Sequence, residues 1–254
     1  MNDDLPHVLE RTVLIQADPH TVFRFFTDSV RWAKWWGAGS TIDPRPGGRV
    51  LIRYPNGASA SGEVLDIAPP ERLVFSFGYD RGQPIAPGRS RVSIRLEAHS
   101  SGTRLHLSHA FAEEAVCRQH VQGWRFQLSL FANVVAEEVF ANATAVVDAW
   151  FEAWLIADDA ARRAAFEKIN VGAVRFNDRF SALESVTDLT EHAGASQRFM
   201  PGVRMKRAGP IRHCQGAVLA NWTTSGGPAP PSSGTNLFLF AADGRIAAVI
   251  GFAA

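Results

Sequence analysis

Two histidines in the first half of the chain, His109 and His120, stand where an imidazole could take part in chemistry. His109 alternates with Leu105 and Leu107, so its side chain is expected on the apolar face of a strand. His120 falls on the inward stripe of the helix predicted to follow. Both rings could then offer hydrogen bonds or proton transfer to a bound carbonyl or phenol. The alternative is that each ring is a core histidine with backbone or side-chain partners.

A carboxylate in the second half of the chain has the sequence context of a general base. Asp178 follows Val174 and Phe176 at alternating positions, which directs its side chain toward an apolar interior. Desolvation there would raise the pKa of the carboxyl group, as a general base requires. The alternative is an aspartate that forms a turn, or an ion pair with the neighbouring Arg175 or Arg179.

Other kinds of chemistry lack their sequence signatures. His109 and His120 have no third ligand at a suitable spacing, so we predict no metal site. The chain has no Gly-rich phosphate loop, nucleophile elbow or Cys-x-x-Cys pair. We therefore expect no cofactor, and any reaction would use acid or base side chains alone.

The first half of the chain is predicted to form one strand, a short helix, a series of antiparallel strands and a long helix. Asp18 and Pro19 begin the short helix as its N-cap and first residue. Trp32, Trp35 and Trp36 are placed on the connection after it, where they could stack on a flat ligand or serve packing. The predicted strands are 8–15, 49–54, 60–67, 72–77, 91–96 and 103–109, and the long helix is 113–135, with Val116, His120, Gly123, Gln127 and Phe131 on its inner stripe.

In the second half, helices precede strands. Asn142 is the predicted N-cap of a helix with Val146, Val147, Trp150 and Trp154 on its inner stripe. Asp158 and Ser185 begin two further helices, which reach Lys168 and Phe199. The predicted strands are 174–178, 203–208, 211–215, 217–224, 235–241 and 245–252.

Length and composition favour two soluble α+β domains, 1–136 and 137–254. The chain has 254 residues, near the limit for one core, and 46% are hydrophobic. The net charge of +1 comes from interspersed charges, so we expect no nucleic acid and no membrane as partner. Two cysteines, and an N-terminus with no basic region before an apolar stretch, are typical of a cytoplasmic protein.

The first 135 residues contain several spaced motifs: Phe26-Thr27-Asp28, Trp35-Trp36-Gly37, Pro46-Gly47-Gly48, Gly62-Glu63-Val64, residues 69–74, Gly102-Thr103-Arg104-Leu105 with Leu107 and His109, and His120 followed by Gly123-Trp124. In their order and spacing they resemble the bacterial activator-of-Hsp90-ATPase-like branch of the START-like helix-grip superfamily, often labelled SRPBCC or polyketide cyclase. This fold would place an elongated cavity between the sheet and the long helix, with Trp35, Trp36, His109, His120 and Trp124 as candidate ligand contacts.

The second half carries its own set of spaced motifs: residues 149–158, 174–178, Gly209-Pro210-Ile211-Arg212, Gly234-Thr235-Asn236 and residues 243–252. With them, residues 140–254 resemble the NTF2-like or SnoaL-like cone fold, which includes ketosteroid isomerases. The resemblance places Asp178 at the catalytic base of those isomerases and Asn236 at their protonated carboxylic acid. Phe151 takes the place of the catalytic tyrosine, and this loss of a donor disfavours ordinary ketosteroid isomerase chemistry. His192 is a further candidate acid or base. The residues expected to line this cavity are Phe151, Trp154, Phe176 and Trp222.

The leading functional hypothesis is binding of a small apolar or aromatic molecule. The cavities could also catalyse a cofactor-independent cyclase, dehydratase or isomerase reaction. The alternative is a protein-interaction module similar to the Hsp90 co-chaperone, with a second domain that forms a homodimer, as NTF2-like sheets commonly do. These hypotheses rest mainly on the fold resemblance. Both superfamilies host many unrelated functions, so the resemblance does not select one of them.

Overall fold

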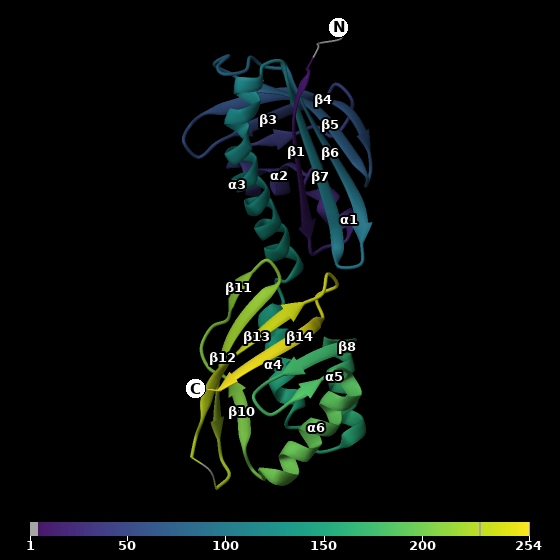
Figure 1. The fold of residues 1–254 in the computed structure, drawn as a ribbon, viewed down its shortest axis with the longest axis vertical. Coiled ribbons are helices and arrows are strands. Elements are labelled where there is room, and N and C mark those ends of the chain that lie inside the picture. The colour runs from purple at the N-terminus through teal and green to yellow at the C-terminus, as the bar shows by residue number, and fades with distance from the viewer. Residues whose placement is uncertain (1–4, 229, 254) are drawn as a thin grey trace. The chain divides into compact units, whose positions relative to one another are not determined.

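The computed structural model describes residues 5–228 and 230–253. The chain divides into two compact units, Met1–Val135 and Ala136–Ala254, which we call the first unit and the second unit. Each unit combines a seven-stranded sheet with helices (Figure 1). The predicted α+β fold class is confirmed.

The first unit is an antiparallel sheet with a long helix against one face, which is the predicted helix-grip arrangement (Figure 1). The strand order is β1-β7-β6-β5-β4-β3-β2. Its elements are β1 (His7–Ile15), α1 (Pro19–Arg24), α2 (Ser29–Trp36), β2 (Thr41–Ile42), β3 (Arg49–Arg53), β4 (Ser59–Ala68), β5 (Arg72–Tyr79), β6 (Ser90–His99), β7 (Gly102–Phe111) and α3 (Glu114–Val139).

The tryptophan cluster lies on a helix, and its placement on a connection was wrong. Asp28 caps α2 by accepting a hydrogen bond from Arg31 N at 2.9 Å. Trp32, Trp35 and Trp36 then fall three and four residues apart, so they share one face of the helix, and all three are buried. A cap followed by this spacing is a helix signal that the sequence contained.

The inner face of α3 differs from the predicted stripe at one position. Gly123 is exposed, and the neighbouring Trp124 is buried instead. Leu128 and Phe131 continue the buried face toward the end of the first unit. Phe131 packs against Phe26 with ring centroids 4.8 Å apart, so α3 is held to the core by large aromatic contacts.

The second unit places helices on one face of a curved mixed sheet, in agreement with the predicted cone-shaped fold (Figure 1). The strand order is β10-β12-β13-β14-β8-β9, β11 also pairs with β12, and β14 runs parallel to β8. The elements are α4 (Ala143–Ala153), α5 (Asp159–Ile169), β8 (Asn170–Asn177), β9 (Ala182–Leu183), α6 (Val186–Phe199), β10 (Arg204–Arg207), β11 (Arg212–Cys214), β12 (Ala217–Ser225), β13 (Ser233–Phe240) and β14 (Ile246–Ala253).

Two of the predicted helix caps are confirmed in detail. Asp18 accepts from Thr21 N at 3.0 Å, and Asp158 accepts from Ala161 N at 2.8 Å. Ser185, predicted as the start of a helix, accepts from Asp188 N at 3.0 Å. Asn142 precedes α4 as predicted, but its side chain makes no capping hydrogen bond. The α4 helix is therefore positioned mainly by packing of its buried face.

Within the described part of the chain, no single helix has both the length and the apolar composition needed to span a membrane. Helices α3 and α4 meet that test only when they are counted together as one bent pair.

Candidate functional site

His109 is fully buried on β7, and protein groups occupy both of its ring nitrogens. Trp124 donates its indole N–H to Nδ1 at 2.9 Å. Nε2 therefore carries the proton and donates to Ser90 Oγ at 2.9 Å. Ser90 in turn donates to the carbonyl oxygen of Phe77 at 2.8 Å. This chain of hydrogen bonds matches the core-histidine alternative.

Burial lowers the pKa of His109 well below its ordinary value of 6.5, and the nearby His120 adds to the effect. The charged form is disfavoured because the ring has left water and has no carboxylate partner in this chain of hydrogen bonds. His109 is thus a neutral group at pH 7.

His120, on α3, is half-buried and meets His109 with ring centroids 5.6 Å apart. Its Nδ1 donates to the carbonyl oxygen of Val116 at 2.8 Å. Its Nε2 lies 3.3 Å from the hydroxyl of Tyr79. Desolvation lowers the pKa of His120. The two imidazoles therefore lie next to each other in the interior of the first unit.

Two tyrosines complete this cluster, and the sequence analysis did not select them. The rings of Tyr79 and Tyr54 stack with centroids 6.2 Å apart. Burial raises the pKa of both hydroxyls, so both are protonated at pH 7. The missed signal was strand alternation: Tyr79 continues the inward stripe of Phe75 and Phe77, and Tyr54 that of Val50 and Ile52.

The three tryptophans chosen as ligand contacts in the first unit are buried in mutual packing. Trp35 and Trp36 have ring centroids 4.3 Å apart, and Trp36 meets Trp124 edge to face at 5.7 Å. Trp35 Nε1 donates to Phe25 O at 3.3 Å. By contrast, Trp36 Nε1 is buried with no hydrogen-bond partner among the described residues. Such an unpaired donor costs about 1–3 kcal/mol, so this indole is a candidate contact for a ligand or water.

A pocket of about 350 Å³ opens beside this cluster, between the β5–β6 connection, the end of β7 and the start of α3. Ser90, Phe111 and Val116 connect it to the histidines, because Ser90 accepts from His109, Phe111 packs on His120 at 4.9 Å, and the carbonyl of Val116 accepts from His120. The full lining is Leu5, Pro84, Ile85, Ala86, Arg89, Ser90, Phe111, Ala112, Glu113 and Val116.

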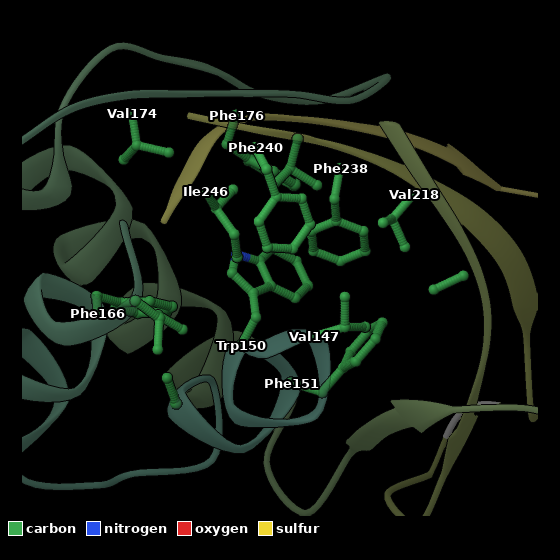
Figure 2. Close-up of a cluster of buried hydrophobic side chains, with 14 of the residues drawn as sticks. Val147, Trp150, Phe151, Phe166, Val174, Phe176, Val218, Phe238, Phe240 and Ile246 are labelled. Atoms are coloured by element: carbon green, nitrogen blue, oxygen red, sulfur yellow. The ribbon is translucent and has the colours of Figure 1, made fainter. Parts of the chain in front are cut away.

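The interior of the second unit is filled by aromatic side chains (Figure 2). Trp150 lies at its centre with no exposed surface, and packs on Phe238 at 5.3 Å and on Phe176 at 5.8 Å. Phe151 and Trp154, predicted to line a cavity, belong to the same buried cluster. The side chains expected to contact a ligand therefore contact one another.

Asp178 lies one residue beyond β8, in a turn, so the strand alternation used to predict its direction ends before it. Its Oδ1 accepts from the backbone N–H of Phe180 at 2.8 Å, and its own N–H donates to Ser181 O at 3.0 Å. The side chain is half-buried. This geometry matches the turn-forming alternative for Asp178.

Asn236 and His192 lie near this turn. Trp222 donates its indole N–H to Asn236 Oδ1 at 3.0 Å, and His192 Nε2 lies 3.1 Å from Ser181 Oγ. A Cβ atom added at Gly251 would lie 3.2 Å from both Asn236 Oδ1 and Asp178 Cβ, so these two side chains flank one glycine. The three predicted catalytic residues are thus brought into one region, and protein partners hold them there.

Within residues 5–228 and 230–253, no group of three or more His, Cys, Asp or Glu side chains could hold a metal ion. His109 and His120 form a pair, and protein groups already engage all four ring nitrogens.

Comparison with known families gives one match, over residues 16–136, to the family described as activator of Hsp90 ATPase homolog 1-like protein. No curated protein matches the chain.

Several solved structures are similar to parts of the chain. Protein MLL2253 of Mesorhizobium loti is 20% identical, with 51% of this chain and 96% of that chain covered and a TM-score of 0.46. A SnoaL-like family protein of Agrobacterium tumefaciens str. C58 is 21% identical, with 44% and 96% covered and a TM-score of 0.41. CalU16 of Micromonospora echinospora is 29% identical, with 52% and 76% covered and a TM-score of 0.41.

Proposed function

We propose that the first unit binds a small, largely apolar molecule at the pocket beside His109 and His120. The observation that carries this proposal is the pocket itself, about 350 Å³ in volume, in which apolar side chains stand beside the polar side chains of Arg89, Ser90 and Glu113. Ligand sites of 300–1,000 Å³ with a few placed polar groups are typical of small-molecule binding proteins. Ser90 supplies such a polar group, backed by the buried hydrogen bond from His109.

Blocking the pocket tests this proposal. Ala112 is an exposed residue of the pocket lining, so Ala112→Trp should fill the space without disturbing the core. Ala115→Trp is the matched control, since Ala115 is exposed on the same helix but is not part of the lining. In thermal-shift and native mass spectrometry screens of aromatic polyketides, steroids and lipids, ligands should bind the wild type and the control. Equal binding to Ala112→Trp would contradict the pocket assignment, and no binding across a broad library would contradict the function.

Acid–base catalysis by Asp178, Asn236 and His192 stays a prediction for the second unit. The shared position of Asp178 and Asn236 beside Gly251 supports it. The filled interior around Trp150 weighs against a substrate site of the usual size. If a cyclase or isomerase reaction is found, Asp178→Asn should abolish it while sparing the fold, and unchanged turnover would remove these residues from the mechanism.

The co-chaperone alternative rests on the description of the matched family. It predicts that the full chain binds Hsp90 and stimulates its ATPase. Absence of both effects in a steady-state ATPase assay would exclude this alternative.

Formation of a homodimer through the second unit is supported by the outer face of its sheet. Leu219 pairs with Leu237, which pairs with Ile250, and Leu239 follows on the same side of β13. These side chains alternate with the buried ones, so they lie on the face away from the helices and are only partly buried. A second copy would cover this apolar face.

Charge on this face should break the dimer. Leu237→Glu is expected to yield monomers in analytical ultracentrifugation, because a carboxylate would have to lose its water in the interface. Thr223→Glu is a matched control at the same alternation of β12, beside Ser233 and away from the leucines. A wild-type monomer at high concentration would contradict the proposal.

A further inference from the structure

The pocket of the first unit has a buried floor that is almost entirely apolar. Ile85, Phe111 and Val116 belong to its lining and are at most 9% exposed, and Ser90 is the polar member of this buried set. The hydroxyl hydrogen of Ser90 is already used on the carbonyl oxygen of Phe77 at 2.8 Å. The floor therefore offers a ligand no side-chain hydrogen-bond donor, so the part of a ligand that reaches it should be apolar.

The rim of the same pocket carries both signs of charge. Arg89 comes from the β5–β6 connection, Glu113 directly precedes α3, and both are exposed members of the lining. Within residues 5–228 and 230–253, the carboxylate of Glu113 takes part in no hydrogen bond or ion pair. Glu113 and Arg89 therefore do not pair with each other, and the mouth of the pocket presents a negative and a positive group side by side in one lining.

Each of these two groups selects a different charge in a ligand. The carboxylate of Glu113 accepts hydrogen bonds from an ammonium group, which has three donors. Arg89 also has an interaction within the protein, but a guanidinium group has five N–H donors, so it can bind a carboxylate as well. A ligand with only one charge would bring that charge close to the rim group of the same sign, which is unfavourable.

We propose that this pocket binds a small zwitterion in which an apolar body carries an ammonium group and a carboxylate at one end, as in an α-amino acid with a large apolar side chain. The apolar body lies on Ile85, Phe111 and Val116. The ammonium group contacts Glu113, and the carboxylate contacts Arg89. The inference rests on the proposed ligand-binding function of the first unit and names the class of ligand.

Three probes with the same phenyl ring and different charges test this inference. They are L-phenylalanine, phenethylamine and 3-phenylpropanoate, titrated into the full chain by isothermal calorimetry at pH 7.5. The amine lacks the carboxylate of phenylalanine, and the propanoate lacks its ammonium group. We expect the wild type to bind L-phenylalanine about three- to fivefold more tightly than either of the other two, which is the effect of one exposed ion pair.

Two single variants should divide the probes in opposite ways. Glu113→Gln removes the negative charge of the rim, so L-phenylalanine and phenethylamine should bind more weakly, while 3-phenylpropanoate should not. Arg89→Gln removes the positive charge, so L-phenylalanine and 3-phenylpropanoate should bind more weakly, while phenethylamine should not. A merely structural role of either residue would weaken all three probes alike.

Two neighbouring charged residues provide matched controls. Glu114 pairs with Arg118 on the helix surface, Arg91 is exposed on β6, and neither Glu114 nor Arg91 belongs to the lining. Glu114→Gln and Arg91→Gln should therefore leave the affinities of the three probes as they are in the wild type. Thermal unfolding of all four variants checks that the fold is retained.

The outcomes distinguish this inference from the proposed function. If no probe binds the wild type and the wider ligand library also gives no binding, both fail together. If the library yields ligands that Ala112→Trp excludes, but L-phenylalanine binds no better than the two singly charged probes, the function stands and the preference for a zwitterion is overturned. A preference for L-phenylalanine that persists unchanged in both Glu113→Gln and Arg89→Gln would also overturn it.

Discussion

The interiors of the two units differ in polarity, although both units wrap a sheet around helices. In the first unit, His109, His120 and Tyr79 reach the interior and form hydrogen bonds there. In the second unit, Trp150 and the phenylalanines around it occupy the centre (Figure 2). The same arrangement of sheet and helices can therefore contain either hydrogen-bonded polar side chains or tightly packed aromatic side chains. Buried polar groups of the first interior form connected hydrogen bonds, whereas among the described residues of the second interior the indole N–H groups of Trp150 and Trp154 have no partner.

Removing the central indole of the second unit should give the largest effect. Trp150→Ala deletes a side chain with no exposed surface, so we expect the free energy of unfolding of the second unit to fall by about 3–5 kcal/mol. Urea unfolding followed by hydrogen exchange would report each unit separately. Binding of any ligand found for the first unit should stay unchanged.

Phe180→Ala is the control for this change, because Phe180 is 83% exposed and its removal should shift stability by less than about 0.5 kcal/mol. Added indole should restore part of the stability of Trp150→Ala by filling the new cavity. A loss below about 1 kcal/mol in that variant would show that the second interior is not closed around Trp150.

The polar interior of the first unit should make stability depend on pH. Burial lowers the folded-state pKa of His109 below 6.5, so between those two values the unfolded chain binds more protons than the folded chain. Stability should therefore rise with pH across this window and fall as the pH drops below about 6.5, by up to about 1.4 kcal/mol per pH unit for this ring. Urea unfolding from pH 4.5 to 8 measures the slope.

His109→Gln isolates this contribution. The glutamine amide can accept from Trp124 and donate to Ser90, but it does not titrate. The slope should become shallower, with a remainder from His120, whose pKa is lowered in the same direction. An unchanged slope would place the pH dependence elsewhere.

The smallest effect concerns the turn in the second unit. Asp178→Ala removes the acceptor for Phe180 N and should lower stability by about 1 kcal/mol. Asp178→Asn keeps a carbonyl oxygen in that place and should stay within about 0.5 kcal/mol of the wild type. If both variants lose the same free energy of unfolding in urea, the negative charge of Asp178, and not its hydrogen bond in the turn, stabilises the second unit.

The sequence predicted the elements well where local signals were strong. The caps at Asp18 and Asp158, the helix start at Ser185 and the inward direction of His109 all follow from local patterns along the chain. The hydrogen-bond partners of His109 could not be predicted in this way. Trp124 and Ser90 come from α3 and β6, and contacts between separate elements leave no local sequence pattern.

The candidate site shows the same limit. Tyr54 and Tyr79 each extended an inward stripe, but their contact depends on how β3 and β5 lie in the folded sheet. Asp178 lies one residue beyond the end of β8, where its side chain accepts from Phe180 N, and this local hydrogen bond was not predicted from the alternation. Whether a cavity is open or filled depends on volumes summed over many elements, so the central position of Trp150 could not be predicted.

The parallel pairing of β8 with β14 has a consequence for biosynthesis. Phe176 lies beside Val249, so β8 leaves the ribosome long before its neighbour is made. In the first unit, strand formation is complete at β7, and β1 finds its partner there. Each unit therefore has an early strand that waits for a partner made much later, and neither sheet can close before its last strand is made. Until then the unpaired edges of β1 and β8 are open to pairing with other chains.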